Sequence, residues 1–170
     1  MANVKRVKLL LCFLLFVFSG YAQGTPEELG KAIFTIFQQD SVDNVLRYIP
    51  TLAEMDTMAN LIGMDTNGDE FKASKAKYPV VLKEFIETIG YIKADERVRW
   101  KTAVLKEVLV RYETSPVDKD SDVKKAVRIA VIRIEFTSGG NPFYLVIPDS
   151  FEIGSKWRMG NNIYLNQLPE

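Results

Sequence analysis

The chain has 170 residues, and its 22 basic and 22 acidic side chains leave no net charge. It has no histidine and a single cysteine, Cys12, which excludes Ser-His-Asp and Cys-His catalysis and zinc sites built from histidine and cysteine. Nucleic-acid binding needs a basic stripe, so we expect no nucleic-acid partner. Any catalysis would have to rest on Asp, Glu, Lys, Arg, Tyr, Ser or Thr.

Residues 1–22 have the pattern of a secretory signal peptide. Three basic residues at positions 5, 6 and 8 precede an apolar run over 9–18, and Gly20 and Ala22 place small residues before a cut. An uncleaved anchor is the weaker alternative, because a membrane-spanning helix needs roughly 20 apolar residues. A lipoprotein is weaker still, because Cys12 lies inside the run. We expect an exported protein, periplasmic or secreted, with no membrane span after cleavage.

Cleavage would leave residues 23–170 as a single domain. The signal peptide contains three of the basic residues. The mature domain would therefore have 19 basic and 22 acidic side chains, a net charge of −3. A domain of this length can bury roughly two thirds of its unfolded surface. Without Cys12 it can form no disulfide, so its stability must come from the core.

The first half of this domain is predicted to be helical. Thr25 to Glu28 forms a capping box with proline at the first helical position, and a helix is expected over 26–39. A short helix over 42–49 should end at Pro50.

Two more helices are expected before the sheet. A second capping box, at 51–54, should start a helix whose apolar stripe includes Met55 and Met58 and which Gly63 ends. A long helix is predicted to begin near Pro79. Gly90 weakens this helix, so its end is expected there or further on toward Arg99.

The second half changes to the period of β-strands. Short turns between strands require antiparallel pairing, because parallel pairing needs a long crossover. The predicted fold class is α+β, with N-terminal helices packed on one face of a curved antiparallel sheet of about four strands. The strands are expected over 104–112, 126–136, 143–153 with an interruption at Pro148, and 156–159 as the final strand.

Four consecutive apolar residues, 129–132, interrupt the alternation expected of a strand with one buried face. The pattern predicts that both faces of the central sheet are covered. Two arrangements would achieve this: a homodimer through the face away from the helices, or a sheet that folds over its own edge.

The segments "TPEELGKAIFTIFQQDSVDNVLRYIP" and "FEIGSKWRM" resemble the opening helices and the closing hairpin of a known fold. This is the nuclear-transport-factor-2-like fold of the cystatin-like superfamily, in small exported bacterial proteins. The resemblance implies a cone-shaped cavity between helices and sheet. Relatives use it to bind ligands or to catalyse isomerisation, dehydration or hydrolysis with an acid–base pair. No catalytic signature of those enzymes can be placed on this sequence.

Asp65, Asn67 and Asp69 have the 1, 3, 5 spacing that begins a calcium-binding loop. Such a loop needs glycine at its sixth position and glutamate at its twelfth, where this chain has Glu70 and Ala76. We therefore expect an Asn-Gly turn, with weak calcium binding as the alternative, and no other metal and no cofactor.

Six residues are candidates for ligand contacts. The two tryptophans could line a pocket but are more often core residues. The charged pair would lie at a cavity mouth if its face pointed inward, and is otherwise solvated. The candidates are Trp157, Tyr112, Tyr144, Arg133, Glu135 and Trp100.

Two functional classes follow. The first is a non-enzymatic binding module for a small apolar ligand or a protein partner. The second is an acid–base enzyme, of isomerase or hydrolase type, that uses a carboxylate and a tyrosine in the cavity. The enzyme needs a carboxylate held in an apolar cavity, and Glu135 comes closest. Apolar residues do not flank Glu135 on both sides of its own face, so the binding module is favoured.

Overall fold

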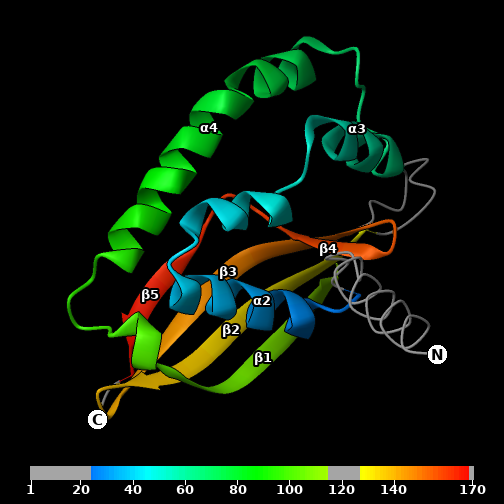
Figure 1. Cartoon of the computed structure of the whole chain (residues 1–170). Helices are drawn as coiled ribbons and strands as arrows, with labels where there is room; N and C mark the ends of the chain where they lie inside the picture. The colour runs from blue at the N-terminus through cyan, green and yellow to red at the C-terminus, as the bar shows by residue number, and fades with distance from the viewer. Residues whose placement is uncertain (1–23, 115–126, 169–170) are drawn as a thin grey trace, which may run out of the picture.

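The computed structural model describes residues 24–114 and 127–168, and it has an α+β fold in which N-terminal helices pack on an antiparallel sheet (Figure 1). The predicted signal peptide lies outside the described residues, as do residues 115–126, which include the first position of the strand predicted over 126–136. Among the described residues, no helix combines the length and the apolar character that crossing a membrane requires.

The helical layer comes first along the chain and follows the capping signals. Thr25 accepts a hydrogen bond from the Glu28 N–H at 3.2 Å, and the complete capping box of Thr51 and Glu54 starts the third segment. These caps satisfy backbone donors that a helix start leaves free, which is why the predicted starts are confirmed. The helices are α2 (Pro26–Gln39), η1 (Val42–Tyr48), α3 (Leu52–Leu61), α4 (Asp69–Lys93) and η2 (Trp100–Thr102).

The long helix α4 begins at Asp69, so the predicted start near Pro79 was wrong. Proline removes the hydrogen bond that its own N–H would give to the carbonyl of Lys75, but contacts on both sides of it hold the helix. Phe71 is buried before it, and Phe85, Ile89 and Ile92 are buried after it. The hydroxyl of Tyr78 also donates to the Pro50 carbonyl. Tertiary contacts therefore outweigh the local signal.

The sheet has five antiparallel strands, one more than expected. Four follow the order β1-β2-β3-β4, and β5 pairs with β3. The prediction that 156–159 is the last strand was wrong, because the short β5 has no apolar alternation that would mark it. The strands are β1 (Val104–Thr114), β2 (Arg128–Ser138), β3 (Asn141–Ile153), β4 (Lys156–Met159) and β5 (Tyr164–Gln167).

Strand β3 continues through Pro148, where an interruption was predicted. Ile147 pairs with Ile132 of β2 and Ser150 pairs with Ala130, so β3 carries one extra residue there, as a bulge. On its other edge β3 pairs with β5 over 143–146 and with β4 over 150–153. Pro148 lies between these partners, where its missing N–H is not needed.

The two faces of the sheet differ in burial. Along β2, even-numbered residues from Ala130 to Ser138 are buried under the helices, and the odd-numbered residues between them are half-buried. The opposite face, which we call the outer face, is therefore only half-covered in a single chain. The expected cover on both faces would need more than the described chain, and the homodimer remains a prediction.

Helix α2 lies directly on the sheet. A Cβ atom at Gly30 would stand 2.7 Å from Val108 Cγ1 and 3.0 Å from Ile132 Cγ2, so glycine permits this approach. Next to it, Trp100 packs against Phe37 and Phe136 with ring centroids 4.6 and 5.2 Å apart. Side chains thus fill the space where the resemblance implies a cavity.

Candidate functional site

A hollow on the helical side lies between α3 and the first turns of α4, and we call it the α3–α4 pocket. Its volume is about 480 Å³. Figure 1 shows α3 and the first turns of α4 next to each other. The lining residues are Met55, Met58, Ala59, Ile62, Met64, Asp65, Gly68, Asp69, Glu70, Phe71 and Ser74.

The floor of the α3–α4 pocket is apolar and rich in methionine. Met55 and Met58 are half-buried and Met64 is 49% exposed. All three are flexible, polarisable side chains, which adapt to ligands of irregular shape. Phe71 is 7% exposed and Ala59 2% exposed, and these two give the floor its rigid part. Such a surface can take up an alkyl or aryl group and gains from removing it from water.

Three carboxylates form the rim of the pocket. Asp65 belongs to the turn before α4, where its Oδ1 accepts the Asn67 N–H at 2.9 Å and its carbonyl accepts the Gly68 N–H at 3.1 Å. Asp69 and Glu70 follow in the first turn of α4. The calcium candidate therefore forms a turn, and within the described ranges no three acidic side chains are grouped so that they could hold a metal ion.

Charged contacts hold α3, one wall of the pocket, in place. Arg158 of β4 donates to Glu54 Oε1 at 2.7 and 3.0 Å. Partial burial acts to raise the pKa of Glu54, but hydrogen bonds from Arg158 and from the Thr51 N–H outweigh it and hold the pKa below its usual value. The pocket wall is thus tied to the sheet by a charged hydrogen-bonded pair.

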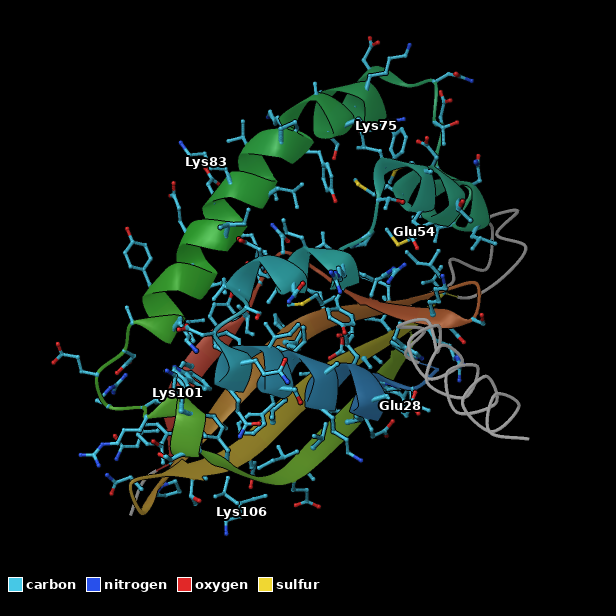
Figure 2. The ribbon with its side chains drawn as sticks, viewed as in Figure 1. Glu28, Glu54, Lys75, Lys83, Lys101 and Lys106 are labelled. Atoms are coloured by element: carbon cyan, nitrogen blue, oxygen red, sulfur yellow. The ribbon has the colours of Figure 1, made fainter. Side chains whose placement is uncertain are left out.

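A second charged contact joins the two walls to each other. Lys75 Nζ of α4 lies 2.8 and 2.9 Å from the carboxylate oxygens of Asp56 on α3, and 5.7 Å from the ring centre of Phe71. Figure 2 shows Lys75 on the part of α4 nearest α3, with Lys83 further along the same helix. The ion pair thus joins α3 to α4, the two helices that supply most of the pocket lining.

Two other pockets lie on the helical layer. One, of about 480 Å³, lies under α4 beside Leu46, Leu52 and Leu82 and reaches Tyr78. Burial, followed by the charge of Glu54, raises the pKa of the Tyr78 hydroxyl above its usual value. The other, of about 270 Å³, lies between α2 and η1. None of the three pockets is lined by a strand residue.

The tryptophan candidates lie in the core. Trp100 is 4% exposed and Trp157 1% exposed. The Nε1 of Trp100 is buried without a hydrogen-bond partner among the described residues. Trp157 has Tyr112 beside it, with ring centres 6.0 Å apart, and Arg128 over its ring at 5.7 Å. Trp157 and Tyr112 therefore meet at one end of the sheet, and neither lines the α3–α4 pocket.

The other three candidates lie together on the outer face. Arg133 forms an ion pair with Glu135 at 2.9 Å, and its guanidinium lies 4.2 Å from the ring centre of Tyr144. The sheet separates them from the helices. The six candidates are thus divided between the core, one sheet end and the outer face, and none of them lines the α3–α4 pocket.

The methionines and Phe71 were not among the predicted site residues. Met55 and Met58 belong to a periodic apolar stripe, which predicts a core face. In the structure only Ala59 of α3 is buried, and Leu52 at the head of the same stripe is 41% exposed. A stripe with this composition looks the same in sequence whether it faces a core or lines a pocket.

A comparison with models of protein families, with curated proteins and with solved structures found no match. The chain is therefore defined by its own structure: an α+β domain with five antiparallel strands and a methionine-lined pocket on its helical side. Any function must be argued from that pocket and its surroundings.

Proposed function

We propose that the protein is an exported, non-enzymatic binding module that holds a small apolar ligand in the α3–α4 pocket. The observation that carries the proposal is the pocket itself, about 480 Å³ in volume with a floor of methionine, isoleucine and phenylalanine. Sites for small molecules usually measure about 300–1,000 Å³ and have mostly apolar linings with few polar groups. The pocket has that size and that lining.

Two further parts of the proposal rest on features other than the pocket. Export is supported by the basic, apolar and small-residue order of residues 1–22. Membership of the nuclear-transport-factor-2-like fold is supported by the order of helices first and antiparallel strands second. The binding site we propose differs from the cavity that the fold implies, because aromatic side chains fill the space beneath α2.

A protein partner and an acid–base reaction are the competing functions. The reaction needs a carboxylate inside an apolar cavity, opposite a tyrosine. Glu135 and Tyr144 instead meet around Arg133 on the outer face, and the carboxylates of the α3–α4 pocket stand at its exposed rim. Neither arrangement supports the reaction as well as the pocket supports binding.

Methionine methyl groups give a direct test of the proposed site. Met55, Met58 and Met64 line the pocket, whereas Met159 is fully buried in the core and serves as an internal control. In protein labelled with ¹³C at the methionine methyls, 1-octanol should shift the NMR signals of Met55, Met58 and Met64 in a saturable way. The signal of Met159 should not move. Saturation without shifts at the three pocket methionines would contradict the proposal.

A variant pair sharpens the same test. Met58→Gln puts an amide into the apolar lining and should weaken octanol binding about three- to tenfold, because bound octanol would cover the amide without giving it hydrogen-bond partners. Val80→Gln is the matched control, since Val80 is 57% exposed on α4 and lines none of the three pockets. Equal loss in both variants would place octanol elsewhere.

A further inference from the structure

We infer that the ligand of the α3–α4 pocket is a cationic amphiphile, with an ammonium group at the acidic rim and an alkyl or aryl body on the methionine floor. The inference rests on the proposed function and names the chemical class that the same pocket selects. It depends on the arrangement of charge around the opening, which the volume and the apolar floor do not determine.

The charged residues of the pocket lining are all negative. Asp65, Asp69 and Glu70 are among the eleven lining residues, and no lysine or arginine is. All three acidic residues are exposed, so they stand where a ligand enters and its polar end remains in contact with water. An ammonium group at the rim would be attracted by these carboxylates, and a carboxylate group would be repelled by them.

The N-terminus of α4 carries partial positive charge, which weakens the negative electrostatic field of the three carboxylates but does not reverse it. Gly68 caps α4 without a side-chain hydrogen bond, so the first N–H groups of the helix present their partial positive charge near the rim. The helix dipole is equivalent to about half a unit charge, against three full negative charges on the carboxylates. The rim therefore attracts cations, and part of its negative charge is stabilised by the helix.

The basic residues of α4 nearest the pocket do not cancel the field either. Lys75 is paired with Asp56 at 2.8 Å, so this contact adds no net charge. Lys72 is exposed and is not part of the lining. The cationic head would complement a site whose own positive charges are already paired or lie outside it.

Three probes with the same chain length separate charge from hydrophobic binding: octylammonium and octanoate below their micelle concentrations, and 1-octanol below its solubility limit. Met55, Met58 and Met64 report binding in the pocket, and Met159 remains the control. Exposed ion pairs contribute roughly a 1.5- to fivefold gain each, so octylammonium should bind about tenfold more tightly than octanol. Octanoate should bind most weakly, and added salt should reduce the differences.

Neutral variants identify the groups responsible. The triple variant Asp65→Asn, Asp69→Asn, Glu70→Gln should lower octylammonium affinity about tenfold, to that of octanol, and leave octanol binding unchanged. The control variant Glu84→Gln, Glu87→Gln, Glu96→Gln removes the same charge from three exposed acidic residues outside the pocket lining. Because both triple variants change the net charge equally, a general charge effect would appear in both.

The outcomes distinguish the inference from the proposed function. If octanol and octylammonium shift the pocket methionines with equal affinity, or octanoate binds best, the inference is overturned and the binding module stands. If no probe shifts Met55, Met58 or Met64, both are overturned. A preference for octylammonium that the rim variant keeps and the control variant loses also overturns the inference.

Discussion

Arg158 on β4 and Glu54 on α3 meet across 104 residues of sequence, with two hydrogen bonds of 2.7 and 3.0 Å to a single carboxylate oxygen. The side chains are 11% and 22% exposed, and Arg158 also donates to the Arg47 carbonyl. Glu54 closes the capping box of α3 as well. One side chain therefore starts a helix and fixes it to the sheet, which positions the wall that carries Met55 and Met58.

Replacing Glu54 should destabilise the fold in two separable steps. Glu54→Ala removes both the capping box and the partner of Arg158, so we expect a loss of about 1–3 kcal/mol in the free energy of unfolding. Glu54→Gln keeps a side chain that can complete the capping box, so its free energy of unfolding should fall by less. Urea unfolding measures both, with the exposed Glu84→Gln as control, expected within about 0.5 kcal/mol of the parent. Equal losses for Ala and Gln would show that the cap contributes nothing.

The same pair predicts a pH dependence. The folded-state pKa of Glu54 lies below its ordinary value of 4.5, so folded protein binds fewer protons there than unfolded protein. The stabilisation of the fold by ionised Glu54 is fully present above pH 4.5. It is lost as the pH falls through the folded-state pKa of Glu54. Between pH 7 and pH 3 the parent should lose more unfolding free energy than Glu54→Gln does. Identical slopes for the two proteins would contradict this coupling.

Gly30 and Gly90 should respond oppositely to alanine. At Gly30 a Cβ would stand 2.7 Å from Val108 Cγ1, so α2 must shift away from the sheet, at a cost of about 1–3 kcal/mol. At Gly90, in α4, a Cβ meets no atom within 4 Å, and alanine should stabilise by about 0.5–1 kcal/mol. Thermal unfolding of the two variants tests this directly. A neutral Gly30→Ala would mean that α2 packs less closely than described.

The ion pair between Asp56 and Lys75 should control local opening more than global stability. Its side chains are 40% and 33% exposed, so Lys75→Met should change the unfolding free energy by less than about 1 kcal/mol. Amide exchange over residues 69–78 should nevertheless accelerate, because the variant loses the contact that joins α4 to α3 at the pocket.

Lys83→Met is the matched control on the same helix. Lys83 is 79% exposed and lies 3.9 Å from Glu87 of its own helix, so its loss leaves the contact between α3 and α4 intact. Exchange over 69–78 should then match that of the parent. If both variants accelerated exchange equally, the effect would come from helix charge rather than from the contact with α3.

The half-buried outer face predicts self-association. It carries Leu109, 40% exposed, and the half-buried Val131 and Val146. Arg133 lies between Leu109 and Val146 in the strand register, so a second copy would cover apolar side chains set around this arginine. Sedimentation at micromolar concentration should give a dimer mass, and Val131→Lys should restore the monomer. Val80→Lys, on exposed α4, should leave the dimer unchanged. A monomer mass for the parent would contradict the prediction.

Local signals in the sequence determined the starts of α2 and α3 and the antiparallel order of the strands. Thr25 and Thr51 act through hydrogen bonds to residues three positions away, and the turn at Gly154 acts through the conformation of one residue. Such effects are complete within a few residues, so they can be recognised without the fold. The absence of histidine was equally decisive, because composition alone removes whole classes of chemistry.

The tertiary structure decided what these segments do. Pro79 remains inside α4 because Phe71 and Phe85 are buried on either side of it, and the residues around Tyr164 become a strand because β3 offers them a free edge. The methionine stripe of α3 lines a pocket because Arg158, far along the chain, holds that helix at the edge of the sheet. Burial is the sum of contacts between distant segments, so periodicity predicts an apolar face without predicting what covers it.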